Sequence, residues 1–225
     1  MNYEPFVNLP TSTGLRYWNE KSSLEYIHSF RQAIKLEFFT SAFDFFREFD
    51  IRGDYFEFGC HQARTFSMAL IESQRFKRDD MHFWAFDSFE GLPDSSKENP
   101  HFKQGAFATS QKSFLELIAP YVPSDSRVHL VPGFYSESLT EDIAAKLRCA
   151  ALITIDCDLV SSFEECLPFA IRLLQKGTIL YIDDWRNNSY GDSTKGIPAV
   201  AKKLLPENMQ PFLSVGWWGQ SFIAL

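Results

Sequence analysis

The 225-residue sequence lacks the features of a secreted, membrane or zinc-binding protein. None of its four cysteines belongs to a C-x-x-C motif, and three of them lie in apolar runs, so we expect buried, reduced thiols. No apolar stretch approaches the roughly 20 residues of a membrane span. The N-terminus has no basic region followed by an apolar core, so we expect no secretory signal. These absences predict a cytoplasmic protein with no membrane partner.

Basic residues are also scarce. The chain has 22 Lys and Arg against 29 Asp and Glu, a formal net charge of -7. Because phosphate binding needs an excess of basic residues on one face, we do not expect a nucleic-acid partner. The hydrophobic content of 45% and the length are typical of a soluble globular protein with one α/β domain.

Two glycine motifs of common enzyme classes are missing. The first predicted strand ends in Gly59, but no G-x-G-x-x-G follows, which argues against the diphosphate site of an NAD-dependent dehydrogenase. No G-x-S-x-G occurs either, so the chain has no nucleophile elbow of the hydrolase type.

Aromatic residues dominate the region before Asp54. Tyr26, Phe30, Ile34 and Phe38 recur every four residues, which predicts one long helix or two short ones between residues 22 and 49. We expect residues 1–53 to form a helical N-terminal extension that caps the core of residues 54–225 within the same domain.

From Asp54 onward, short apolar runs alternate with helical patterns. The expected strands are Asp54–Gly59, His82–Asp87, Val128–Pro132, Ala150–Asp156 and Thr178–Asp183, and the expected helices are Ala63–Phe76, Gln111–Tyr121, Glu141–Leu147, Ser162–Lys176 and Ile197–Leu205. Two further strands, Gln210–Val215 and Gln220–Leu225, flank a Gly-Trp-Trp-Gly turn. The pattern predicts an α/β, Rossmann-like fold: a seven-stranded, mostly parallel sheet that ends in an antiparallel hairpin, with helices on both faces.

Ligands of open parallel sheets bind at the carboxyl ends of the strands. Glu57 and Gly59 end the first expected strand, where a carboxylate suits a cationic amino-acid ligand and a glycine allows close approach of the backbone. Asp87 ends the second and can accept hydrogen bonds from ribose hydroxyls. The alternatives are a strand-end polar residue at Glu57 and a turn-forming acid at Asp87.

Acids also follow the fourth and fifth expected strands. Asp156 ends one, and Asp183 and Asp184 end the other, each after a largely apolar run. Neighbouring strands lie about 4.8 Å apart, so these carboxylates can converge. Three carboxylates suit a hard ion such as Mg²⁺, although Asp183 or Asp184 could instead cap the following turn.

Six segments in order carry a resemblance: YFEFGC, FDSFEGLP, GAFATS, VPGFYSESL, IDCDLVSS and GTILYIDDW. They resemble the successive motifs of the macrocin O-methyltransferase family. The resemblance implies a class I methyltransferase fold, S-adenosylmethionine and Mg²⁺ as cofactors, and O-methylation of a hydroxyl on a small molecule, such as a sugar in natural-product biosynthesis.

The resemblance also implies roles for single residues. Glu57 and Gly59 hold the methionine end of the cofactor and Asp87 its ribose. The cofactor-binding set further includes Cys60, Ser88, Gly133 and Phe134. Asp156, Asp183 and Asp184 are implied metal ligands, and Asp156 is also a candidate base. His61 is a second catalytic candidate, with an ordinary surface histidine as the alternative.

Three departures from the family pattern lie near this site: Gln62-Ala63-Arg64-Thr65 where glycines and a serine are usual, Val160, and Trp185. They leave open a cofactor-binding protein without catalytic activity. A separate and less favoured alternative is an NAD-dependent dehydrogenase, against which the missing glycine motif and the terminal hairpin both argue. Trp217 and Trp218 are candidates either for a homo-oligomer interface or for partly buried aromatics of a turn.

Overall fold

A computed structural model describes residues 20–94, 98, 100–122, 127–186, 189 and 192–225. Its centre is a seven-stranded sheet in the order β3-β2-β1-β4-β5-β7-β6. The strands are β1 Asp54–Phe58, β2 Phe83–Asp87, β3 Val128–Pro132, β4 Ala150–Ile155, β5 Ile179–Ile182, β6 Met209–Val215 and β7 Gly219–Ala224. Strands β1 to β5 pair in parallel, whereas β7 is antiparallel to both β5 and β6. The expected sheet and terminal hairpin are confirmed.

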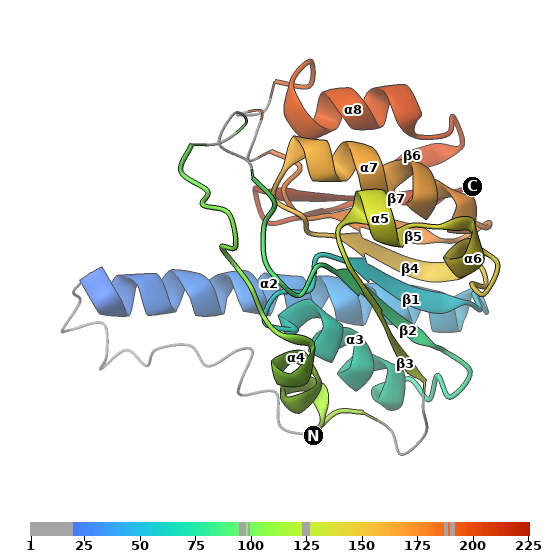
Figure 1. Ribbon diagram of the computed structural model, residues 1–225. Coiled ribbons are helices and arrows are strands. Elements are labelled where there is room, and N and C mark those ends of the chain that lie inside the picture. The colour runs from blue at the N-terminus through green and yellow to red at the C-terminus, as the bar shows by residue number, and fades with distance from the viewer. Residues whose placement is uncertain (1–19, 95–97, 99, 123–126, 187–188, 190–191) are drawn as a thin grey trace.

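Helices cover both faces of the sheet, as expected (Figure 1). One face carries α2 Glu20–Glu48, α3 Arg64–Arg75 and α4 Gln111–Ile118. The other carries α5 Tyr135–Ser138, α6 Glu141–Ala144, α7 Val160–Ala170 with the 3₁₀ turn η2 Ile171–Leu173, and α8 Gly196–Leu204.

The two faces bury separate apolar cores. Every residue of β1 is buried, and its side chains alternate between the faces: Tyr55 packs with the α2–α3 side, and Phe56 and Phe58 pack with the α7–α8 side. Strands buried on both faces read as predominantly apolar runs in sequence, as in β4 and β5, which is why these strands are predictable.

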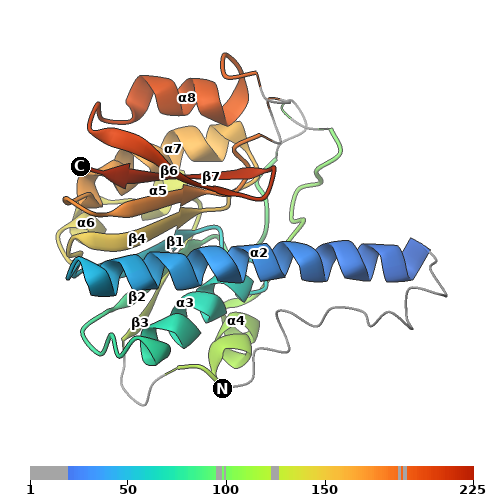
Figure 2. The same cartoon turned by 180° about the vertical axis from the view of Figure 1, so that it is seen from behind.

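The aromatic N-terminal region forms one long helix, α2. Phe39, Phe43 and Phe46 are buried in the core between α2 and the sheet, whereas the side chain of Phe30 is 46% exposed. The first half of α2 extends beyond the sheet, and the second half lies across it beside α3 (Figure 2). In the described part of the chain, no helix is long and apolar enough to cross a membrane.

The expected strand ends agree with the structure to within one residue, but some expected helices are too long. Gln111–Tyr121 ends at Ile118, Glu141–Leu147 ends at Ala144, and Ser162–Lys176 begins at Val160 and ends at Ala170 before η2. The single turn α5 was not predicted, because four residues are too few to show a helical period. Cys60, Cys157 and Cys166 are buried, Cys149 is exposed, and all four are free thiols.

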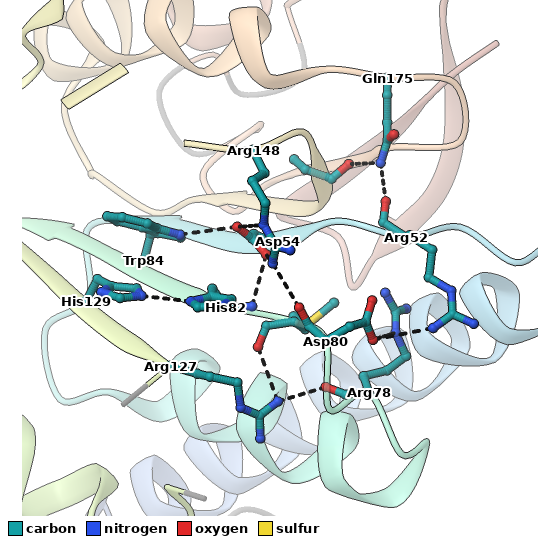
Figure 3. A network of polar contacts seen from close by, with 12 residues as sticks. Arg52, Asp54, Arg78, Asp80, His82, Trp84, Arg127, His129, Arg148 and Gln175 are labelled. Atoms are coloured by element: carbon teal, nitrogen blue, oxygen red, sulfur yellow. Dashed lines mark hydrogen bonds and ion pairs between the residues drawn. The ribbon is translucent and has the colours of Figure 1, made fainter. Parts of the chain in front are cut away.

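A polar network joins the amino ends of the parallel strands (Figure 3). The buried carboxylate of Asp54 accepts hydrogen bonds from Arg148, through Nη2 and through Nε at 3.1 Å, and from the backbone N–H of His82 at 3.0 Å. Trp84 donates to the same carboxylate at 3.4 Å and stacks on His129, with ring centroids 4.2 Å apart. These contacts tie β1, β2, β3 and the approach to β4 together.

Candidate active site

A cavity of about 280 Å³ opens at the carboxyl ends of the parallel strands. Five residues of the predicted cofactor set line it: Gly59, Asp87, Ser88, Gly133 and Phe134. Both catalytic candidates, Asp156 and His61, line it as well. Tertiary structure therefore brings together residues that lie up to about a hundred positions apart in the sequence.

Position 59 requires a glycine, because the end of β1 lies directly against Asp156, the residue that follows β4. Its φ is +85°, and a Cβ at this position would fall on the carbonyl oxygen of Asp156. Its backbone N–H donates to the carbonyl of Phe86 at 2.9 Å. No other residue type can keep β1 and β4 so close at the cavity wall.

Asp87 organises the loop after β1. One carboxylate oxygen accepts from the backbone N–H groups of Cys60 at 2.7 Å and His61 at 3.3 Å, and the other accepts from that of Phe89 at 2.7 Å. These bonds fix the carboxylate at the edge of the cavity, where further lone pairs can accept hydrogen bonds from a ligand.

Two residues of the predicted cofactor set do not line the cavity. Glu57 is fully buried, accepts hydrogen bonds from Tyr55 and, at 2.9 Å, from Thr65, and has a pKa that burial raises to about 8. Cys60 packs its side chain into the core, so only its backbone faces the loop. A direct role for either in cofactor binding stays a prediction.

The predicted acids do converge. One carboxylate oxygen from each of Asp156, Asp183 and Asp184 lies within 4.8 Å of the others. They are brought together because β4 and β5 pair in parallel, with Ile155 beside Ile182. Asp156 belongs both to this acid cluster and to the cavity wall, so the cluster and the cavity adjoin at this residue.

Protein donors hold Asp183 in place. Its Oδ1 atom accepts hydrogen bonds from the Tyr181 hydroxyl and from Trp218 Nε1, the latter at 3.1 Å. Trp218 comes from the hairpin turn directly before β7, the strand that pairs with β5, so this turn supports the acid cluster from the neighbouring strand.

Lys35 is a member of the site that the sequence predictions missed. It reaches in from α2, with Nζ 2.9 Å from Asp183 Oδ1 and 3.3 Å from Asp156 Oδ2. One sequence feature could have identified Lys35: it lies one turn before Phe38 and Phe39, on the same buried face of α2. A lysine on an apolar helix face needs a buried partner.

Burial and crowding set the charges of the cluster. Burial and the Asp183 charge raise the pKa of Asp156 to about 8, and burial and the Asp156 charge raise that of Asp158 to about 7. Burial opposes ionisation of Asp183, but the Lys35 charge and the Tyr181 hydroxyl hold its pKa below the usual range. A shared proton therefore resides on Asp156 in preference to Asp183.

The donor set fits a divalent cation. Carboxylate oxygens are the ligands that Mg²⁺ prefers. Binding of such a cation would displace the proton that Asp156 holds, because a nearby positive charge favours the ionised carboxylate.

His61 is fixed by the segment that covers the cavity. Its Nδ1 lies 2.7 Å from the carbonyl oxygen of Phe107, so Nδ1 carries the proton and Nε2 is the acceptor.

Three residues that depart from the family pattern have defined places in the structure. Ala63 adopts a φ of 57°, a conformation that glycine adopts without strain. Thr65 donates a hydrogen bond to Glu57, and Trp185 packs on Phe222 with ring centroids 5.0 Å apart.

Several solved structures share the fold. The O-methyltransferase NovP matches with a TM-score of 0.68 and 18% identity, over 85% of this chain and 79% of its own. The calicheamicin methyltransferase CalS11 matches with a TM-score of 0.68 and 18% identity, over 99% of this chain and 96% of its own. An O-methyltransferase from Bacillus cereus, in complex with SAH, matches with a TM-score of 0.52 and 13% identity, over 98% and 99%. These identities establish the fold alone.

A search of curated proteins finds no significant match. In contrast, the sequence profile described as macrocin-O-methyltransferase (TylF) matches residues 26–195, well over half of the chain. The matched region contains Lys35, the cavity residues and the acid cluster. The chain therefore belongs to the macrocin-O-methyltransferase family, whose members are S-adenosylmethionine-dependent O-methyltransferases.

Proposed function

We propose that this protein transfers the methyl group of S-adenosylmethionine to a hydroxyl oxygen of a small molecule, a sugar or another natural-product intermediate. The observation that carries the proposal is the position of Asp156, shared by the cavity and the acid cluster. The neighbour CalS11 is described as a TDP-rhamnose 3'-O-methyltransferase, which favours a sugar acceptor.

In this proposal the cavity binds the methyl donor. Asp87 and Ser88 would accept hydrogen bonds from the ribose side, and Phe134 would pack against the base or ribose, since all three line the cavity. Gly59 and Gly133 let the backbone come close to the ligand. Binding in this way aligns the sulfonium methyl with the acceptor, and alignment of this kind contributes about 7–11 kcal/mol to lowering a barrier.

Asp156 is the proposed base. As the hydroxyl oxygen forms its bond to the methyl carbon, the carbon–sulfur bond breaks, its electron pair returns to sulfur, and the hydroxyl proton passes to Asp156. Only the ionised carboxylate of Asp156 can accept this proton, and a cation bound at the acid cluster or a pH above about 8 would favour that form. His61 lines the same cavity and is the second candidate for this role. A divalent ion bound by Asp156, Asp183 and Asp184 would supply Lewis acidity, which lowers the pKa of an acceptor hydroxyl.

Calorimetric titration with S-adenosylhomocysteine tests the cofactor assignment. We expect micromolar binding by the wild-type protein and weaker binding by Asp87→Ala, because the variant loses both the ribose acceptor and the anchor of the loop after β1. Asp192→Ala is the matched control. Asp192 pairs with Lys195 and does not line the cavity, so this variant should bind like wild type. Absence of binding by the wild-type protein would refute the proposed function.

A further inference from the structure

Lys35 places a positive charge inside the acid cluster. The residue is 8% exposed and belongs to the buried stripe of α2. Its Nζ atom forms ion pairs with two carboxylates, those of Asp156 and Asp183. The side chain is therefore an ammonium ion at neutral pH, and its charge is stabilised by these two acids.

The Lys35 ammonium uses oxygens that a metal ion would also need. Its Nζ lies 2.9 Å from Asp183 Oδ1 and 3.3 Å from Asp156 Oδ2, so it bridges the acids that end β4 and β5. Mg²⁺ binds carboxylate oxygens at about 2.0–2.1 Å and requires near-octahedral geometry. A divalent ion between the same acids would lie next to the ammonium group, where the two cations repel each other strongly.

Other donors restrict the freedom of Asp183. The oxygen that faces Lys35 also accepts from Trp218 at 3.1 Å and from Tyr181. Because Asp183 is anchored in this way, its carboxylate cannot easily rotate to bind a metal ion at one position and Lys35 at another.

We propose that Lys35 is a resident cation of the acid cluster, which holds Asp156 and Asp183 together without a metal ion and competes with divalent ions for them. This inference rests on the proposed function, since it concerns the acids assigned there to metal binding. It makes Lys35 a positioning residue, and it predicts that divalent ions bind more weakly to this chain than the three acids of the cluster suggest.

Titration calorimetry with Mn²⁺ alone, without cofactor or acceptor, tests the competition. Lys35→Met keeps much of the side-chain length but removes the charge, and we expect it to bind Mn²⁺ at least about tenfold more tightly than wild type. Lys35→Arg restores the charge and should bind as wild type does. Lys202→Met, at an exposed position of α8, is the matched control and should leave the affinity unchanged. Equal or weaker Mn²⁺ binding by Lys35→Met would overturn the proposal.

Thermal unfolding provides a second readout. Without metal, Lys35→Met should unfold at a lower temperature than wild type, because its acids repel one another. Mn²⁺ should then raise its midpoint by more than it raises that of wild type. If the variant is unfolded without metal, recovery of the folded circular dichroism signal in Mn²⁺ supports the proposal, and no recovery contradicts it.

Titration of the same proteins with S-adenosylhomocysteine separates this proposal from the proposed function. Loss of that binding in wild type would refute the methyltransferase assignment. The Mn²⁺ comparison between wild type and Lys35→Met would still decide the role of Lys35.

Discussion

At the scale of single residues, buried ionisable groups gather at the carboxyl edge of the sheet. Glu57, Asp156 and Asp183 share this region with Lys35, and their charges influence one another. Ionised groups are costly to bury unless partners compensate them. Ionisable groups with shifted pKa values beside a cavity are typical of functional sites. Here they coincide with residues that the sequence motifs identified.

Asp183→Asn tests the proposed role of the acid cluster. The variant keeps an acceptor for Tyr181 and Trp218 but loses the charge, so we expect methyl transfer to fall by about 10²–10³-fold and the stimulation by Mg²⁺ that the proposed function predicts to be lost. Initial rates with a working acceptor measure the effect, and binding of S-adenosylhomocysteine should be retained. Turnover near that of wild type would contradict a role for Asp183 in metal binding.

Glu57 should make stability depend on pH. Its pKa is about 8 in the folded protein against 4.5 for an exposed group, so between these values the folded state holds a proton that the unfolded state releases. The contribution to stability is complete below the lower value, declines as pH rises, and is lost above about 8.

Glu57→Gln cannot ionise, so it should lose this decline. From about pH 5 to about pH 8, we expect the unfolding temperature to fall less for Glu57→Gln than for wild type. Thermal circular dichroism measures the difference. Glu164→Gln, on the exposed side of α7, is the control and should follow wild type. Parallel curves for wild type and Glu57→Gln would show that Glu57 ionises normally.

At the scale of secondary structure, α2 connects the core to the site. Its second half buries Phe39, Phe43 and Phe46, and Lys35 lies one turn earlier at the acid cluster. We infer that the described part of the N-terminal extension is necessary for folding as well as for the site.

Phe39→Ala tests the contribution of α2 to the core. Phe39 is fully buried and packs on Tyr55 with ring centroids 6.1 Å apart, so its truncation should cost about 3–5 kcal/mol. Phe30→Ala, at a 46% exposed position of the same helix, should cost less than about 1 kcal/mol. Urea denaturation measures both, and equal losses would mean that α2 is not part of the cooperative core.

At the scale of the whole molecule, the two ends of the parallel strands have different tasks. The carboxyl ends carry the cavity and the acid cluster. The amino ends carry the network around Asp54, whose partners are protein groups (Figure 3). We therefore expect changes at the amino ends to affect stability without affecting ligand binding.

Arg148→Met tests this separation. The substitution leaves the buried Asp54 carboxylate without its ionic partner, and because Arg148 is half exposed we expect a loss of about 1–3 kcal/mol. Chemical denaturation measures the loss. Under native conditions, the affinity for S-adenosylhomocysteine should equal that of wild type, and a weaker affinity would show that the two ends are coupled.

The sequence by itself determined the order and nature of the strands, the terminal hairpin, and the acids that follow β4 and β5. These features depend on local patterns: strands buried on both faces are predominantly apolar, and parallel pairing brings successive strand ends to one edge. Only the tertiary structure decided that Lys35 joins Asp156, 121 positions away, and that Glu57 and Cys60 point into the core. Such contacts depend on how a helix lies on the sheet and on the direction of each side chain, and neither is encoded in the spacing of residues along the chain.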